Sequence, residues 1–316
     1  MARMTVLHVH CHITSRPLAG EADWWQVRNL LIDTYPLTPT DMNWDLRRWD
    51  GQRFHREDTA LDARWSNRVR LWFAAEDRIV AAAHPEGAGD VYLQVHPDYR
   101  HLEEEMLDWA ELELAAPVPE TAVRQLHAFA YDYDSPRQRL LHDRGYGKTS
   151  EAGVARRLRL GHKVLPQPDL AEGYRLRTTR AGVGGDCQRL ADLLNAAFRR
   201  TSHTAAEYHN FSTLSPSFRH DLNLVAENGD GAFAAHVGVT FDEANHRGIF
   251  EPVCTHPDHR RRGLARSLMF EGLLRLRDLG AMDVYVGTGD DPAANQLYEA
   301  VGFTEAYRGN VWRKQW

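Results

Sequence analysis

The stretch that decides the fold reads His256-Pro257-Asp258-His259-Arg260-Arg261-Arg262-Gly263-Leu264-Ala265. Its first five residues repeat an earlier pentapeptide, His96-Pro97-Asp98-Tyr99-Arg100, at a separation of 160 positions (256 − 96). Two other landmarks recur in the same order, since Ser15-Arg16-Pro17 and Leu140-Leu141 correspond to Thr179-Arg180-Ala181 and Leu297-Tyr298. A repeated order of landmarks predicts the duplication of one domain.

The length of the chain agrees with a duplication. At roughly 150 residues per domain, 316 residues suggest about two domains. The segment Gly161-His162-Lys163-Val164-Leu165-Pro166-Gln167-Pro168 interrupts helical and strand periodicity with two prolines and a glycine. We therefore expect one domain over residues 1–160 and a second over residues 172–316.

Composition restricts the class of protein. Hydrophobic residues make up 43% of the chain and charged residues 26%, and no apolar run approaches the roughly 20 residues that cross a bilayer. Residues 1–8 lack the apolar stretch of a signal peptide, and the three cysteines form no Cys-x-x-Cys pair, so we expect a cytoplasmic protein without membrane contact. A net charge of −6 argues against nucleic acid as a partner.

Hydrophobic periodicity and turn residues outline the second half. The expected strands cover residues 174–177, 221–226, 232–241, 247–255, 284–286 and 306–314. The expected helices cover residues 187–198, 204–211, 264–279 and 292–300, with Thr204 as an N-cap, Pro292 as a first residue and Gly280 as a stop. This order predicts an α/β domain in which one helix starts at Gly263.

The junction at Gly263 is suited to a pyrophosphate. A glycine turn that opens a helix directs unpaired backbone N–H groups and the positive end of the helix dipole at one point. The run Arg260 to Arg262 adds cationic charge there, although such a run by itself is more typical of a solvated face. The pattern matches neither a nucleotide-triphosphate loop nor a dinucleotide loop.

Together these residues resemble one family. Arg260-x-x-Gly263-x-Ala265 after a strand is similar to the pyrophosphate loop of the GNAT N-acetyltransferase superfamily, and residues 295–303, Asn-Gln-Leu-Tyr-Glu-Ala-Val-Gly-Phe, resemble the signature of its last helix. The resemblance implies two GNAT-like α/β domains, each with a mixed, mostly antiparallel sheet flanked by helices. The family often has Asn at the position of Asp291, with Asn295 one turn later here.

The resemblance also implies a site for acetyl-coenzyme A between two splayed strands. Its pantetheine would pair with backbone groups, and its pyrophosphate would lie on the amides of the glycine loop. The expected coenzyme-binding residues are Val253, Cys254, Thr255, Arg260, Arg261, Arg262, Gly263, Leu264, Ala265, Arg266 and Asn295. No metal is expected.

Acetyl transfer to an amine needs a base for the ammonium, with an ordinary pKa near 10.4, and an acid for the departing thiolate. The resemblance makes Tyr298 the candidate acid, with a packing residue as the alternative. Glu251 is the candidate base, directly or through water, with His256 as a lesser option and a strand carboxylate paired with an arginine as the alternative.

The acceptor is expected to be a small-molecule amine, acetylated by direct attack in the second domain. The family admits it near residues 199–208, which makes His203 and Tyr208 candidate contacts. Two other functions remain open: an acetyl-coenzyme A sensor or scaffold without turnover, and a protein or peptide N-acetyltransferase.

Three other features of the sequence have simple structural interpretations. His8, His10 and His12 alternate as metal ligands on a strand do, but no carboxylate or thiolate partner is evident nearby, so we interpret them as ordinary strand histidines. Cys254 is a small apolar residue rather than a nucleophile, because direct transfer needs no covalent step. Seven of the nine tryptophans lie before residue 110, either as core residues or as a wall for the acceptor.

The first copy lacks the features of the coenzyme site. After Arg100 come His101-Leu102-Glu103-Glu104-Glu105, whose carboxylates repel phosphates at a helix N-terminus. Leu141 stands where the second copy has Tyr298. We therefore predict a degenerate first domain and a catalytic second one, a plan known among tandem GNAT proteins.

Overall fold

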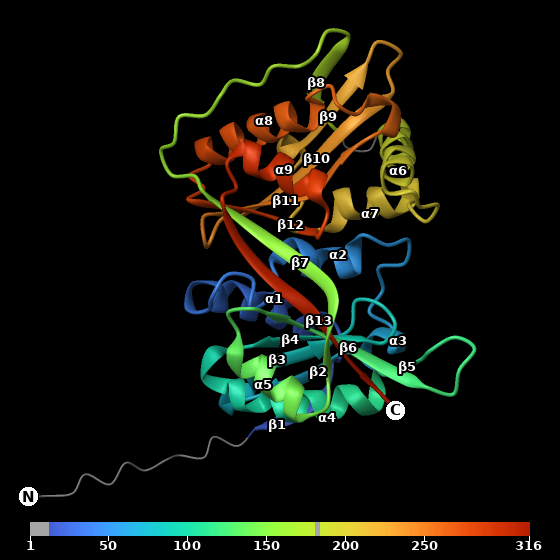
Figure 1. Cartoon of the computed structure of the whole chain (residues 1–316), viewed down its shortest axis with the longest axis vertical. Coiled ribbons are helices and arrows are strands. Elements are labelled where there is room, and N and C mark those ends of the chain that lie inside the picture. Colours follow the sequence, from blue (N-terminus) through green and yellow to red (C-terminus); the bar gives the residue numbers. More distant parts are fainter. Residues whose placement is uncertain (1–12, 181–183) are drawn as a thin grey trace, which may run out of the picture. The chain divides into compact units, whose positions relative to one another are not determined.

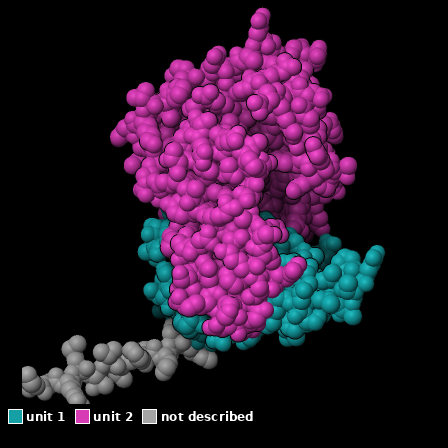
Figure 2. All heavy atoms as spheres, in the orientation of Figure 1, with its two compact units in different colours: residues 1–38, 61–128, 314–316 teal, residues 39–60, 129–313 magenta. Residues whose placement is uncertain are grey.

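The computed structural model describes residues 13–180 and 184–316, which form two compact units. Unit 1 comprises residues up to 38 together with 61–128 and 314–316, and unit 2 comprises residues 39–60 and 129–313 (Figure 2). These units do not follow the predicted halves of the sequence, because residues 39–60 and 129–159 belong to unit 2. No helix in the described ranges is long and apolar enough to cross a membrane.

Unit 1 is a sheet with helices. Its helices are α1 (Glu21–Thr34), α3 (Ala63–Ser66) and α4 (Glu103–Glu113). Its strands are β1 (Thr14–Pro17), β2 (Arg70–Phe73), β3 (Ile79–His84), β4 (Asp90–Val95), β5 (Ala116–Pro117) and the first part of β6 (Arg124–Tyr131). β1 to β4 pair antiparallel in sequence order, and β4 pairs parallel to β6.

Unit 2 contains the longer sheet. Its strands are β7 (Gly147–Arg159), β8 (Tyr174–Thr178), β9 (Asn223–Asn228), β10 (Phe233–Asp242), β11 (Arg247–Thr255), β12 (Asp283–Gly289) and β13 (Glu305–Gln315), of which β13 ends in unit 1. Its helices are α2 (Leu46–Phe54), α5 (Ser135–Asp143), α6 (Gly184–Phe198), α7 (Ala205–Leu214), α8 (Leu264–Asp278) and α9 (Pro292–Val301).

The same pairing pattern occurs in both units. β8 to β11 pair antiparallel in sequence order and β11 pairs parallel to β12, as β1 to β4 and β6 do in unit 1. The predicted fold class is confirmed, since the strands of each unit pair in a mixed, mostly antiparallel pattern and are flanked by helices. The elements expected in the second half are present within a few residues of their predicted bounds.

Strand β7 has partners that the sequence did not predict. It precedes the proline-rich segment, yet it pairs antiparallel with both β12 and β13 inside unit 2. Residues 160–173, all described, contain neither helix nor strand. The last strand of the first sequence half therefore completes the sheet that carries the second.

The core of unit 2 lies on both faces of this sheet. Helices α8 and α9 cover one face, with Leu268, Leu273 and Phe303 packed on β9 to β12. Helices α6 and α7 cover the other, where Leu190 and Tyr208 pack with residues of β9 to β11 (Figure 1). Because side chains alternate along a strand, β9 serves both faces.

Candidate functional site

The two copies of the His-Pro-Asp sequence form the same turn. His256 accepts a hydrogen bond through Nδ1 from the backbone N–H of Asp258 at 3.3 Å, and His96 accepts one from Asp98 at the same distance. Each turn is a short 3₁₀ segment, Pro257–His259 in the second copy. The repeated sequence is thus a repeated structure as well.

After this turn the second copy opens a helix with free amides. Gly263 has a φ of 73°, in the left-handed region that favours glycine, and α8 begins at Leu264 without a cap from any described side chain. A Cβ built on Gly263 would meet no described atom within 4 Å, so the backbone is open there. The first N–H groups of α8 and the positive end of its dipole therefore face open space, as an anion site requires.

In the first copy a carboxylate lies at the corresponding place. α4 begins at Glu103, which is only 2% exposed, and the Nε atom of Arg100 donates to its Oε1 atom at 2.6 Å. The anion at the N-terminus of α4 is therefore the Glu103 carboxylate, which belongs to the protein itself. This ion pair supports the expectation that the first copy does not bind coenzyme A.

The arginines before Gly263 differ in what they contact. Arg260 donates from Nη2 to the backbone oxygen of Ala197 at 3.2 Å and, at the long distance of 3.5 Å, from Nε to that of Thr255. The guanidinium of Arg262 lies 5.9 Å from the ring centre of Tyr174. The side chain of Arg260 thus links the loop to the end of α6, although all three arginines are exposed.

The parallel ladder between β11 and β12 is short. It runs from Arg247 opposite Asp283 to Phe250 opposite Val286 and goes no further. Beyond it, Val253, Cys254 and Thr255 pair only with β10, on the opposite side of β11. Within the described ranges, the edge of β11 that faces β12 is open at these three residues, as the predicted pantetheine contacts require.

Tyr298 lies on α9 with its ring in the core and its hydroxyl free. The residue is 5% exposed, and its ring centre lies 6.3 Å from that of Phe303. No described group forms a hydrogen bond with its hydroxyl. The hydroxyl oxygen keeps some contact with solvent. Burial, reinforced by the nearby Asp291 carboxylate, raises the pKa of Tyr298 well above its ordinary value, so the hydroxyl stays protonated at neutral pH.

The other two candidate groups on β11 differ in environment. Glu251 is exposed, while Cys254 is buried. Burial raises the pKa of Cys254 to about 12, which keeps it a thiol and argues against a nucleophile. A Cβ on Gly238 of β10 would lie 2.6 Å from the backbone oxygen of Glu251, so only glycine permits the irregular pairing that bends β11 here.

The amide of Asn295 is used within the protein. Its Oδ1 atom accepts a hydrogen bond from Nε of Arg156 at 2.7 Å, and its Nδ2 atom donates to the backbone oxygen of Asp291 at 2.8 Å. Arg156 lies on β7 and also pairs with Glu299 at 2.7 Å. Asn295 therefore anchors α9 to β7.

The predicted acceptor residues lie on the α7 face of the sheet. Tyr208 is 4% exposed, and its hydroxyl oxygen lies 3.3 Å from Oγ1 of Thr179. His203 and His55 both contact the Oε1 atom of Glu207 through Nδ1, at 3.1 and 2.5 Å. The pKa of His55 is lowered, and burial of the imidazole is the largest cause of this shift.

Sequence reasoning missed His55 and Glu207. Glu207 follows Thr204 at the spacing of a capping box, and the Thr204 hydroxyl accepts the Glu207 N–H at 3.2 Å, so that motif was readable. No local pattern marks His55.

The three ligand atoms of His55, His203 and Glu207 lie within 4.8 Å of one another, a spacing that one metal ion could fit. The alternating histidines 8, 10 and 12 lie outside the described residues.

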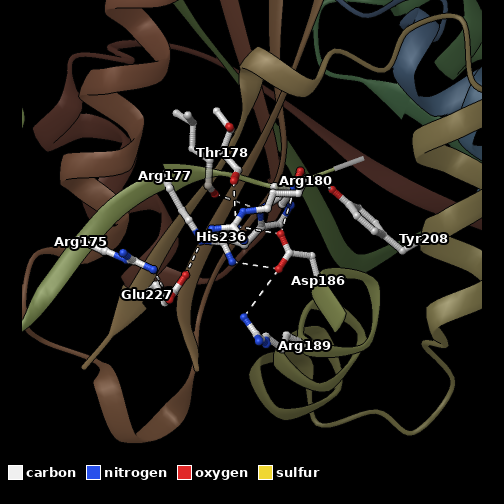
Figure 3. A network of polar contacts seen from close by, with 11 residues as sticks. Arg175, Arg177, Thr178, Arg180, Asp186, Arg189, Tyr208, Glu227 and His236 are labelled. Carbon is white, nitrogen blue, oxygen red and sulfur yellow. Dashed lines mark hydrogen bonds and ion pairs between the residues drawn. The ribbon is translucent and has the colours of Figure 1, made fainter. Parts of the chain in front are cut away.

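An ion-pair network fixes α6 to the sheet beside this face (Figure 3). Arg177 on β8 donates to both carboxylate oxygens of Asp186, at 2.8 and 2.9 Å, and also binds Glu227 of β9. Burial raises the pKa of Asp186, but the hydrogen bonds and charge of Arg177 outweigh it, so the net pKa is lowered. The network holds α6, and with it the connection to α7.

Comparisons with known proteins agree with this geometry. Residues 187–303 match the family model described as "Acetyltransferase (GNAT) family". No curated protein matches the chain. Among solved structures, a GCN5-related N-acetyltransferase from Sphaerobacter thermophilus is 20% identical with a TM-score of 0.65, over 96% of this chain and 95% of that one.

Two further solved structures are similar over nearly the whole chain. A tandem GNAT protein from the clavulanic acid biosynthesis pathway is 17% identical, with a TM-score of 0.65, over 96% of this chain and 98% of that one. A GNAT-family acetyltransferase from Colwellia psychrerythraea is 12% identical, with a TM-score of 0.58, over 95% of this chain and 100% of that one. At such identities these neighbours show the fold alone. Residues 187–303, which contain the uncapped α8 and the open edge of β11, are therefore similar to the acetyltransferase domains of the GNAT family.

Proposed function

We propose that this domain transfers the acetyl group of acetyl-coenzyme A directly to a small-molecule amine. The observation that carries the proposal is the presence of two openings within residues 253–264, at the end of β11 and at the start of α8. No described side chain caps the amides that follow Gly263, and the β11 edge at Val253 to Thr255 has no described partner on the side of β12. The first suits a pyrophosphate and the second an extended pantetheine chain.

Two groups near this opening have separate roles in the reaction. The Tyr298 hydroxyl stays protonated and has no described partner, so it donates a hydrogen bond to the departing thiolate. Because its pKa exceeds that of a thiol, it stabilises the thiolate without giving up its proton fully. Glu251, exposed two residues before Val253, accepts the proton of the amine directly or through water.

We also propose that the chain is a tandem of two such folds, over residues 1–160 and 172–316, with only the second catalytic. The equal strand pairing in the two units and the equal His-Pro-Asp turns support this proposal. The Arg100–Glu103 ion pair at the start of α4 supports the loss of the first coenzyme site.

The test is thiol release from acetyl-coenzyme A against a library of amines. Release that depends on both substrates and disappears in Gly263→Glu is expected. Coenzyme binding by calorimetry without release for any amine would instead indicate a sensor or scaffold, and release only with peptides would indicate a protein acetyltransferase.

A further inference from the structure

Arg47 on α2 is a buried arginine that forms no ion pair with any described residue. The residue is 7% exposed, and its Nε atom is buried without a hydrogen-bond partner. No described residue forms an ion pair or hydrogen bond with its other nitrogens either, and those two nitrogens keep contact with solvent. Its described contacts include the ring of Phe211, whose centre lies 4.4 Å from the guanidinium carbon.

Such a group is costly unless something pairs with it. The guanidinium stays charged at any physiological pH, and a buried charge is stabilised only by an opposite charge or by hydrogen bonds. The carboxylate that α7 contributes, Glu207, is already bound to His55 and His203. The neighbouring Arg53, by contrast, donates from Nε to the backbone oxygen of Thr59 at 3.0 Å.

Ring contacts connect Arg47 to the strand that borders the proposed pantetheine site. Phe211 lies 5.6 Å from Phe218, Phe218 lies 6.0 Å from Tyr208, and Tyr208 lies 6.5 Å from His236, all measured between ring centres. His236 on β10 is directly opposite Cys254 on β11. Arg47 therefore belongs to the same face of the sheet as the predicted acceptor contacts.

We propose that the acceptor amine carries an oxyanion, a carboxylate or a phosphate, which binds the guanidinium of Arg47 against Phe211. This inference rests on the proposed function and names the class of its substrate. The planar fork of an arginine matches two oxygens of either group, and the ring beneath it holds the fork in place. The anion supplies the negative charge that no described residue provides to Arg47.

The experiment compares matched pairs of amines that differ in the anionic group. The pairs are phenylalanine and 2-phenylethylamine, ornithine and 1,4-diaminobutane, and O-phosphoethanolamine and ethanolamine. The anionic member of at least one pair should show a kcat/KM more than about tenfold above its neutral partner. The first two pairs test a carboxylate and the third a phosphate.

Variants then assign the preference to Arg47. Arg47→Met keeps the stem over Phe211 and should lower kcat/KM for the preferred anionic amine on the order of 10²-fold, mainly through KM, while neutral amines change less than about threefold. Arg47→Lys, which keeps the charge without the fork, should recover part of the loss. Arg48→Gln is the matched control, since Arg48 lies over Trp44 at 4.2 Å and should leave the preference unchanged.

Three results would overturn the inference: equal kcat/KM within every pair, an equal loss for anionic and neutral amines in Arg47→Met, or a loss of acetyl-coenzyme A affinity in that variant. If no amine is acetylated, the proposed function fails, and the anion site is tested separately. Anionic amines should then still raise the melting temperature of the coenzyme A complex in the wild type and not in Arg47→Met. No such shift in the wild type overturns the site as well.

Discussion

Replacing Tyr298 by phenylalanine separates catalysis from packing. The ring lies among the buried residues of the α8–α9 core, whereas the hydroxyl bonds to no described group. Removing it leaves no described hydrogen-bond partner unsatisfied, so the free energy of unfolding should change by less than about 0.5 kcal/mol. Affinity for acetyl-coenzyme A should stay within a few-fold.

The chemical step should respond strongly to the same change. If the hydroxyl stabilises the departing thiolate, its loss should lower the rate on the order of 10²-fold, or about 2.7 kcal/mol in the activation free energy. Single-turnover rates with saturating amine measure this step without interference from product release. Tyr307→Phe is the control, because the Tyr307 hydroxyl donates to Oε2 of Glu305 at 3.0 Å.

The control should show the opposite pattern, with a stability loss of about 1 kcal/mol and an unchanged single-turnover rate. A Tyr298→Phe protein that keeps its rate would refute the catalytic assignment. A Tyr298→Phe protein that loses stability while keeping its rate would show that the hydroxyl has a structural partner instead. Neither result would affect the proposed coenzyme site.

Three further predictions concern the coenzyme site and the ion pair that holds α6. Gly263→Glu should abolish acetyl-coenzyme A binding, because it adds a negative charge at the open N-terminus of α8, and wild-type calorimetry should give about one site per chain; two equal sites would contradict the loss of the first. Cys254→Ala should keep kcat within a few-fold, and Cys254 should resist iodoacetamide at pH 7, since burial raises its pKa to about 12. The pKa of Asp186 is lowered in the folded protein, so its stabilisation is present above its unfolded pKa near 3.9 and is lost as pH falls through the folded value. The difference in melting temperature between wild type and Asp186→Asn should therefore shrink between pH 5 and pH 3. A difference that stays constant would count against the ion pair with Arg177.

Several features of the site were readable from sequence because they depend on neighbours along the chain. The Asp258 amide bonded to His256, the left-handed Gly263 and the start of α8 at Leu264 are all set within about ten residues. The order of strands and helices after residue 174 follows from hydrophobic periodicity, which local segments carry by themselves. The placement of Tyr298 on the last helix came from the family signature.

Other features needed the folded chain. Asn295 was expected to bind the coenzyme, yet its amide is bonded to Arg156, a residue 139 positions away. Arg47 and His55 precede residue 60, and nothing in their local sequence places them against α7. Such contacts join segments whose separation in sequence carries no signal about their distance in space.

By itself, the sequence predicted two copies of one α/β fold, and it showed that only the second copy of the repeated pentapeptide is followed by a glycine. Only the tertiary structure decided that β7 lies between β12 and β13 and that α2 contributes a buried arginine to the face of α7. The physical reason is the range of the interactions. Turn and helix-start preferences act between near neighbours, whereas a strand edge accepts any strand of suitable pattern, so the choice of partner is settled by packing across the whole sheet.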